Sequence, residues 1–251
     1  MEISLHNKTV LITGGASGAG VDIVRSFVST GANIAFTYHS NRPDFLLKEL
    51  ESYPIKAYAY DQSQVSAIEL LLKDIMRDFP SIDVLVNNAG IYPARAFDEI
   101  SEEDWDRMMD TNLKGVFFLS RAVSRIMKNG SIINISSINA SNPAVKLIHY
   151  GISKAAIEME TRCLAYELGP NIRVNCIAPG LIYKQGQEQF IPGWRESYCE
   201  RSALKRLVNA GDIGNTAVFL ASDLSSAMTG QVLTVDCGVM LAPCFDNSLE
   251  D

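Results

Sequence analysis

Short apolar runs alternate with longer amphipathic stretches along the whole of this sequence. The runs are apolar on successive positions, so both faces of each run carry hydrophobic side chains. That pattern is typical of strands that are buried on both sides. The predicted strands are Thr9–Ile12, Asn33–Tyr38, Ile55–Tyr60, Asp83–Val86, Ser131–Ser136, Ile172–Ala178 and Gln231–Asp236.

The stretches between these strands have the periodicity of helices that bury one face. Ser63 and Ser101 are predicted to begin two of them, and Ser101 is followed by the acidic Glu102-Glu103-Asp104. Strands that alternate with helices predict an α/β fold, doubly wound, whose parallel sheet is flanked by helices and joined by right-handed crossovers. The predicted helices are Gly18–Ser29, Asp44–Ser52, Ser63–Phe79, Ser101–Lys128, Tyr150–Leu168 and Ala210–Ser222.

Composition and charge exclude several classes of protein. The chain of 251 residues is 47% hydrophobic and 20% charged, and neither a repeat nor a flexible linker divides it, so we expect one domain over 1–251. A net charge of -7 without a Lys/Arg-rich run argues against a nucleic-acid partner. No apolar run approaches the roughly 20 residues that cross a bilayer, which argues against a membrane partner.

The N-terminus and the cysteines indicate a compartment. Met1–Leu5 lacks the basic and apolar regions of a signal peptide, so we expect the protein in the cytoplasm. The five cysteines are scattered without C-x-x-C spacing, which predicts neither a disulfide framework nor a metal site.

Tyr150 and Lys154 are the first candidates for chemistry, since residues four apart share a helix face. A free tyrosine has a pKa of about 10, and reaching neutrality requires a shift of roughly 3 units, or about 4 kcal/mol. A cation at about 4 Å supplies roughly that much where the effective dielectric constant is near 20. The pair is therefore sufficient for proton transfer, although such a pair on its own is equally consistent with a structural role.

A glycine-rich turn, Thr13–Gly20, follows the first predicted strand and precedes a predicted helix. Small residues and free backbone N–H groups at a helix start form a phosphate-binding site; the alternative is a simple tight connection. Asp61 and Asn88 follow two other strands, where polar and small residues suit a nucleotide groove. Each of these alone is also ordinary turn chemistry.

Taken together, the motifs resemble those of the short-chain dehydrogenase/reductase family over nearly the whole chain, and its 3-oxoacyl carrier-protein reductase branch in particular. The resemblance implies a Rossmann-type fold with a seven-stranded parallel sheet. Cys237 stands where the family usually has glycine, a departure expected to affect packing rather than chemistry. The matching residues are Thr13-Gly14-x-x-x-Gly18-x-Gly20, Asp61, Asn87-Asn88-Ala89-Gly90, Asn112, Ser137, Tyr150-x-x-x-Lys154, Pro179-Gly180 and Thr229–Asp236.

By this resemblance, Tyr150 is the acid/base and Ser137 holds the substrate oxygen. Lys154 lowers the tyrosine pKa and bridges the nicotinamide ribose. A water held at Asn112 links Lys154 to solvent. Asn112 is also a poor helix former, so a kink, a water site or an exposed surface position would explain it. Hydride would pass between the nicotinamide and a carbonyl carbon. The residues expected to bind the cofactor are Gly14, Ser17, Gly18, Ala19, Tyr38, His39, Ser40, Asp61, Gln62, Asn88, Ala89, Gly90, Ser136, Tyr150, Lys154, Pro179, Gly180 and Ile182.

The end of the second strand bears on the choice of cofactor. An acidic residue there would bind the ribose 2′-hydroxyl of NAD(H) and repel a 2′-phosphate. The chain instead has His39, Ser40 and Arg42, which favours NADP(H) with NAD(H) still possible. Ser17 stands where similar NADP-dependent proteins often carry Arg or Lys, and His39 and Arg42 could also be ordinary loop residues.

The segment at about 183–207 is expected to form a lid over the substrate, and an amphipathic helix pair is the alternative. Lys184 departs from the threonine that is common in the family and could contact a phosphate, an acidic substrate or only solvent. His149 is expected to be a hydrogen-bonded surface or pocket residue, with a substrate role as the alternative. Among its aromatic residues the segment contains Phe190, Trp194 and Tyr198.

The predicted function is an NADP(H)-preferring carbonyl reductase or alcohol dehydrogenase acting on a small molecule. The alternative is a catalytically silent nucleotide-binding sensor or scaffold. Arg121, Arg125 and Lys128 would share a helix face and could dock an acyl carrier, or simply be solvated. The resemblance also implies a homo-tetramer or homo-dimer; Ile157, Leu164 and Leu168 could line its interface or cover the sheet.

Overall fold

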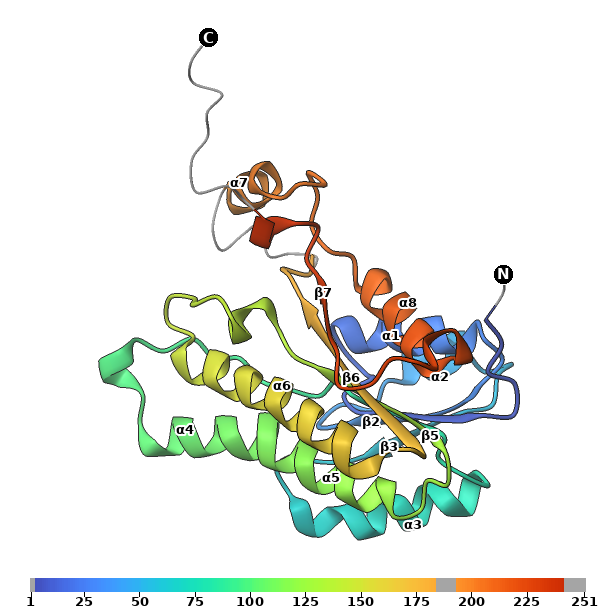
Figure 1. The fold of residues 1–251 in the computed structure, drawn as a ribbon. Coiled ribbons are helices and arrows are strands. Elements are labelled where there is room, and N and C mark those ends of the chain that lie inside the picture. The colour runs from blue at the N-terminus through green and yellow to red at the C-terminus, as the bar shows by residue number, and fades with distance from the viewer. Residues whose placement is uncertain (1–2, 184–192, 242–251) are drawn as a thin grey trace, which may run out of the picture.

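A seven-stranded parallel sheet forms the centre of the structure, a computed structural model that describes residues 3–183 and 193–241 (Figure 1). The strand order is β3-β2-β1-β4-β5-β6-β7, and every neighbouring pair is parallel. The predicted α/β doubly wound fold is therefore confirmed. The strands are β1 (Thr9–Ile12), β2 (Asn33–Tyr38), β3 (Ile55–Ala59), β4 (Val84–Asn87), β5 (Gly130–Ile135), β6 (Ile172–Pro179) and β7 (Val232–Val235).

Helices cover both faces of this sheet: α1, α2 and α8 lie on one side, and α3, α4, α5 and α6 on the other (Figure 1). The helix start predicted at Ser101 is confirmed, and the structure shows a capping box there with Asp104 as its partner. The helices are α1 (Ala19–Val28), α2 (Asp44–Glu49), α3 (Ile68–Asp78), α4 (Glu102–Met109), α5 (Gly115–Ser124), α6 (Ile148–Leu168), α7 (Trp194–Arg201) and α8 (Ala210–Ala221).

Alternate residues of the central strands enter two different hydrophobic clusters. Val10 and Ile12 of β1 pack on the α1/α8 side, whereas Leu11 between them packs on the α3/α5 side. The same alternation occurs in β2, where Phe36 and Ala35 belong to opposite clusters. A strand covered on both faces needs apolar residues at every position, which explains the continuous apolar runs of the sequence.

Two of the predicted helices differ from the structure. The helix predicted over Ser101–Lys128 is interrupted by a π-helical turn, Asp110–Lys114, and ends at Ser124. The helix predicted from Ser63 begins instead at Ile68, after a short 3₁₀ turn, because Ser63 donates its N–H and hydroxyl to Asp61. Side-chain bonding of this kind competes with helix formation.

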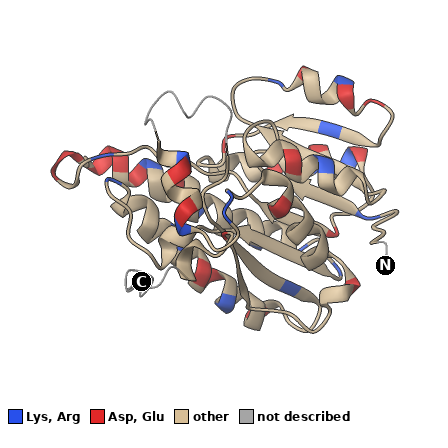
Figure 2. Cartoon of the chain, turned by 90° about the horizontal axis from the view of Figure 1, so that it is seen from above, with Lys and Arg blue, Asp and Glu red and all other residues tan. Residues whose placement is uncertain are grey.

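Charged side chains of both signs are distributed around the fold, and acidic ones gather in the segment that leads into α4 (Figure 2). Since α5 ends at Ser124, Arg125 and Lys128 lie beyond it and do not form the predicted helical stripe with Arg121. Arg121 instead lies over the Phe118 ring, 4.8 Å from its centroid. Among the described residues, none of the helices is long and apolar enough to cross a membrane.

Candidate active site

The glycine turn joins β1 to α1 at the carboxyl end of the sheet. Gly14 has a φ of 65°, in the left-handed region, and its N–H donates to the Thr37 hydroxyl at 3.0 Å. A Cβ at Gly14 would come within 2.9 Å of the Ala89 Cα, so glycine is needed there. Gly18 caps α1 without a side-chain hydrogen bond, which leaves backbone N–H groups for an anion.

Asn88 fastens this turn to the neighbouring strand. Its side-chain amide donates to the Thr13 and Gly14 carbonyls at 3.0 and 3.2 Å. In return the Thr13 hydroxyl accepts from the backbone N–H groups of Asn88 and Ala89 at 3.1 and 3.0 Å. The ends of β1 and β4 are thus held together at the point where the strand order reverses, which is where ligands bind in doubly wound sheets.

At the ends of β2 and β3, the structure brings His39 and Asp61 together. The His39 Nε2 lies 3.6 Å from one Asp61 oxygen, and the other oxygen accepts from the N–H and hydroxyl of Ser63 at 2.9 and 2.7 Å. Burial opposes ionisation of Asp61, but the Ser63 hydrogen bonds and His39 outweigh it and lower its pKa. Ser40 lies 2.7 Å from His39 Nδ1, whereas Arg42 pairs with Asp44 at 3.1 Å.

Tyr150, in the first turn of α6, lies beside the hydroxyl of Ser137. The Ser137 hydroxyl acts to lower the Tyr150 pKa, and the Tyr92 ring packs edge-on against Tyr150 with 6.1 Å between centroids. Ser137 also accepts from the Asn139 N–H at 3.1 Å, which fixes its rotamer. The structure therefore brings together the phenol and the serine hydroxyl that the sequence predicted to share a substrate oxygen.

Lys154 lies one helical turn further along and is almost completely buried. Its ammonium donates to the Ile135 carbonyl at 2.8 Å and lies 5.7 Å from the centroid of the Tyr150 ring. Burial lowers the pKa of Lys154 to about 8.

In this arrangement the pKa of Tyr150 is raised, so the lowering of that pKa by Lys154 stays a prediction. Burial raises that pKa, and the Ser137 hydrogen bond opposes the rise only in part. The ammonium lies against the ring and bonds the Ile135 carbonyl, and it does not offset the loss of solvent around the phenol.

Asn112 occupies the π-helical turn and is fully buried, so it is not an exposed helical residue. Its side-chain oxygen accepts from the Ile91 N–H, and its amide donates to the Ile91 carbonyl, both at 2.8 Å. The amide also reaches the Ser153 hydroxyl at 3.2 Å. The side chain thus fixes the loop after β4 to α6, and the water expected at this residue stays a prediction.

Gly90 separates Asn112 from Lys154. A Cβ there would lie 3.2 Å from the Asn112 oxygen and 3.5 Å from the Lys154 ammonium, so a side chain would fill the space in front of the lysine. Gln62 is buried, and both polar atoms of its side-chain amide lack a partner among the described residues. An open glycine position and an orphaned amide are features of a groove that accommodates a nucleotide.

The remaining candidates lie around β6 and its neighbours. Ser136 directs its hydroxyl at α6, where the Lys154 carbonyl and a Glu158 oxygen each lie at 3.1 Å, so its contact with a cofactor stays a prediction. Pro179 ends β6, and the following Gly180 packs against Asp236, to whose Cα a Cβ would come within 2.8 Å. Ile182 forms a bridge to Val208.

His149 differs from its prediction. It is fully buried, and neither ring nitrogen has a hydrogen-bond partner among the described residues. Lys184 and Phe190 lie outside the described residues, whereas Trp194 and Tyr198 belong to α7.

Three further residues support the site but were not predicted: Thr37, Tyr92 and Ser153. Thr37 stands near the carboxyl end of β2, and that position at the end of a predicted strand could have identified it as a site residue. Tyr92 follows the glycine at the end of β4 in an irregular loop, and nothing in the sequence pattern marks its ring as a neighbour of Tyr150. In residues 3–183 and 193–241, we found no group of three or more His, Cys, Asp or Glu residues that could hold a metal ion.

Comparisons with known proteins agree with this geometry. Residues 14–240 match the family model described as enoyl-(acyl carrier protein) reductase. A 3-oxoacyl acyl-carrier-protein reductase of Thermotoga maritima is 37% identical, with 94% of this chain and 99% of that protein aligned. The chain belongs to the short-chain dehydrogenase/reductase family.

Solved structures of short-chain dehydrogenases/reductases share the fold. A protein of Brucella melitensis described as a short-chain dehydrogenase/reductase, glucose/ribitol dehydrogenase, has a TM-score of 0.88 at 32% identity, covering 95% of this chain and 99% of that one. A gluconate 5-dehydrogenase of Burkholderia cenocepacia, in complex with NADP and tartrate, has a TM-score of 0.89 at 27% identity, covering 96% and 98%. As a short-chain dehydrogenase/reductase, the protein is an oxidoreductase that uses a nicotinamide cofactor to interconvert a carbonyl and an alcohol.

Proposed function

We propose that the protein is an NADP(H)-preferring reductase or dehydrogenase in which Tyr150 transfers the proton. The observation that carries the proposal is the cluster of Tyr150, Ser137 and Lys154 at the carboxyl edge of the sheet. A sensor or scaffold would need only the glycine turn. The protein is expected to act in the cytoplasm as a single domain over 1–251.

The glycine turn, Asn88 and Gly90 would hold the nucleotide, which supplies or accepts the hydride. Ser137 donates to the substrate oxygen, where negative charge develops, while Tyr150 gives that oxygen its proton. Lys154 stabilises the tyrosinate that remains, and Asn112 keeps the loop beside the lysine in place. In the direction of alcohol oxidation, Tyr150 accepts the proton instead.

Replacing Tyr150 tests this assignment. Loss of a positioned general acid typically costs 10²–10⁴-fold, so we expect kcat of Tyr150→Phe to fall by roughly that factor. Cofactor affinity, measured by fluorescence titration, should stay within about twofold, since the ring and its packing on Tyr92 remain. Tyr53→Phe makes the same chemical change on an exposed tyrosine outside the site and should retain full activity.

The substrate for this experiment comes from a screen that follows NAD(P)H absorbance. The relatives suggest 3-oxoacyl thioesters and sugars or polyols, to which simple ketones and secondary alcohols are added. Activity that Tyr150→Phe leaves intact would contradict the proton-transfer role. A complete lack of turnover with every substrate class, despite tight cofactor binding, would instead favour the sensor or scaffold.

The residues at the end of β2 support a preference for NADP(H). His39 and Ser40 stand where a carboxylate would select NAD(H). We expect NADPH to bind more tightly than NADH, and His39→Asp to shift the ratio of the two dissociation constants toward NADH by about tenfold, or about 1.4 kcal/mol. His39→Gln is the matched control, because it adds no negative charge. Tighter binding of NADH by the unaltered protein would overturn the preference.

A further inference from the structure

The chain that leaves β6 emerges beside the proposed reacting residues. Strand β6 pairs with β5, and the Ser136 N–H donates to the Ile177 carbonyl at 2.8 Å. Since neighbouring parallel strands end at the same edge of the sheet, the residues that follow Pro179 come out next to Ser137. A nicotinamide that reaches the proposed proton donor would therefore lie against this part of the chain, residues 180–183 (the exit segment).

Both backbone groups of Leu181, in the exit segment, are held by residues further along the chain. The Leu181 N–H donates to the Tyr198 hydroxyl of α7 at 2.9 Å, and the Leu181 carbonyl accepts from the Val208 N–H at 3.2 Å. Ile182 forms a bridge to Val208, and the Tyr183 N–H donates to the Val208 carbonyl at 3.1 Å. The exit segment is thus held by one backbone partner, Val208, and by the side chain of Tyr198.

Two side chains on one face of α7 lie against the exit segment. Arg195 and Tyr198 are three residues apart, so they project from the same side of the helix. The Arg195 guanidinium carbon lies 4.8 Å from the centroid of the Tyr183 ring. Burial raises the pKa of Tyr198, so its hydroxyl stays protonated near pH 7 and is a neutral acceptor for the Leu181 N–H.

Gly180 leaves the room that the Tyr198 hydroxyl needs. A Cβ on Gly180 would come within 2.9 Å of that hydroxyl oxygen and within 2.8 Å of the Asp236 Cα. The hydroxyl therefore packs directly on the backbone of the exit segment, with no side chain between them.

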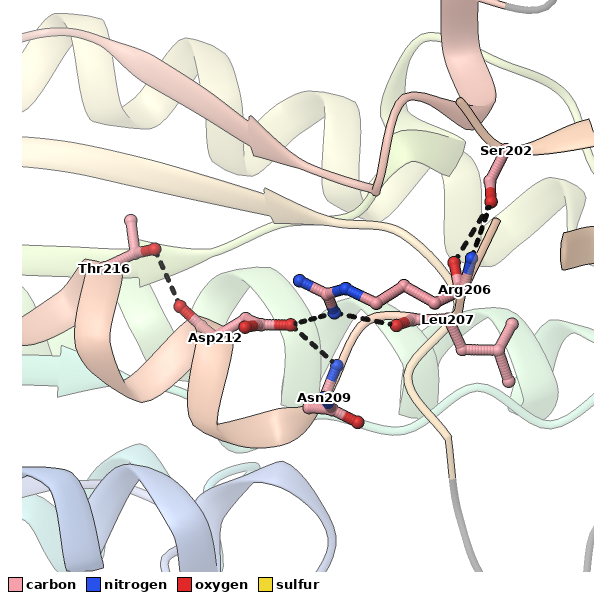
Figure 3. Close-up of polar contacts among 6 residues, drawn as sticks. All are labelled: Ser202, Arg206, Leu207, Asn209, Asp212 and Thr216. Atoms are coloured by element: carbon pink, nitrogen blue, oxygen red, sulfur yellow. Dashed lines mark hydrogen bonds and ion pairs between the residues drawn. The ribbon is translucent and has the colours of Figure 1, made fainter. Parts of the chain in front are cut away.

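The end of α7 is fixed to the start of α8 by polar contacts (Figure 3). The fully buried Ser202 donates its hydroxyl to the Arg206 carbonyl at 3.1 Å and accepts from the Arg206 N–H at 3.2 Å. The Arg206 guanidinium donates to Asp212 at 2.7 Å, and Asp212 also accepts from the Asn209 N–H at 2.9 Å. The helix that carries Tyr198 therefore stands on a base that is itself held in place.

We propose that Tyr198 is a positioning residue for the nicotinamide half of the cofactor, an inference that rests on the proposed function. Its hydroxyl holds the exit segment in place before the cofactor arrives, so the backbone does not have to be ordered as the nicotinamide binds. The adenosine half would lie at the other end of the groove, at the ends of β2 and β3, and gains nothing from this contact.

Tyr198→Phe tests the proposal, because it removes the hydroxyl and keeps the ring. Isothermal titration calorimetry compares NADP⁺ with 2′-phospho-ADP-ribose, which lacks only the nicotinamide. We expect the dissociation constant of NADP⁺ to rise about tenfold in the variant and that of 2′-phospho-ADP-ribose to stay within about twofold. NAD⁺ and ADP-ribose provide the same comparison without the 2′-phosphate.

Tyr53→Phe is the matched control, since Tyr53 is an exposed tyrosine outside the site, and it should leave all of these dissociation constants unchanged. Urea denaturation of the same proteins measures the stability of each variant. If Tyr198→Phe weakens both members of a nucleotide pair equally, or weakens neither, the hydroxyl serves only the fold and the inference is wrong, while the proposed function stands. An unaltered protein that binds none of the four nucleotides would overturn the proposed function together with the inference.

Discussion

At the scale of single residues, Glu160 is a carboxylic acid that the fold buries in α6. Both of its oxygens lack a hydrogen-bond partner among the described residues, and burial raises its pKa from 4.5 to about 8. The folded state therefore binds a proton that the unfolded state has released over that interval. Stability is unaffected by this group below about pH 4.5 and falls as the pH rises toward 8.

Glu160→Gln removes this ionisation and tests its linkage to folding. We expect the variant and the unaltered protein to have similar free energies of unfolding at pH 5, where both side chains are neutral. At pH 8 the variant should be more stable by about 1–3 kcal/mol, since each pKa unit corresponds to about 1.4 kcal/mol. Urea denaturation across this pH range measures the difference.

Glu167→Gln is the control for that series, because Glu167 is an exposed acid on the same helix. It should leave the pH dependence unchanged. A Glu160→Gln variant whose stability runs parallel to that of the unaltered protein from pH 5 to 8 would show that Glu160 is ionised without cost.

Only part of the arrangement of the proposed reacting residues could be predicted from the sequence. Helical spacing alone places Tyr150 and Lys154 on one face, and the structure keeps them there. The direction of the Tyr150 pKa shift depends on burial and on where the Lys154 ammonium finds its acceptor, the Ile135 carbonyl. Both depend on tertiary contacts, which cannot be predicted from the spacing of residues along one helix.

At the scale of elements, α1 and α8 pack so closely that one glycine of α8 has no room for a side chain. A Cβ on Gly214 would collide with the Ser26 side chain of α1. We expect Gly214→Ala to lower the free energy of unfolding by about 1–3 kcal/mol, the usual cost of overpacking. Thermal or urea denaturation gives the value.

Gly211 offers the matched substitution in the same helix. A Cβ there meets no atom within 4 Å, so Gly211→Ala should stabilise the protein by about 0.4–1 kcal/mol. Opposite signs for the two substitutions are the expected result. Equal effects would mean that helix propensity, rather than contact with α1, determines the response of α8.

The structure explains why the predicted helix over 101–128 could not be read correctly. Amphipathic periodicity continues through Asp110–Lys114, but a π-helical turn lets Asn112 satisfy both backbone groups of Ile91. The poor helix propensity of asparagine predicted an irregularity, and its type follows from a partner 21 residues away in the chain. Strands buried on both faces were easier to predict, since their apolar runs depend on burial alone.

At the scale of the whole molecule, we propose a homo-tetramer or homo-dimer assembled through α4, α5 and α6. Ile157, which could have lined such an interface, packs inward with Val116 and Cys176. Leu164 and Leu168 pack against the core under α5 as well. The exposed large apolar side chains on these helices are Trp105, Phe117, Ile148, Ile152, Met159 and Tyr166.

Sedimentation velocity tests the assembly. We expect a species larger than the 27.5 kDa monomer at micromolar concentration and its dissociation in Met159→Lys, because burying an unpaired charge at an interface is costly. Leu70→Lys introduces the same charge on the exposed face of α3 and should leave the assembly intact. A monomer at every concentration tested would rule the proposal out.

The close seam between α1 and α8 also has a consequence for synthesis on the ribosome. The apolar face of α1 is complete once Val28 has emerged, yet the helix that packs against it begins only at Ala210. At about 5–20 residues per second, that interval lasts roughly 10–40 s. Throughout that time the side of α1 that faces α8 is uncovered, which makes the nascent chain a substrate for chaperones until α8 has emerged.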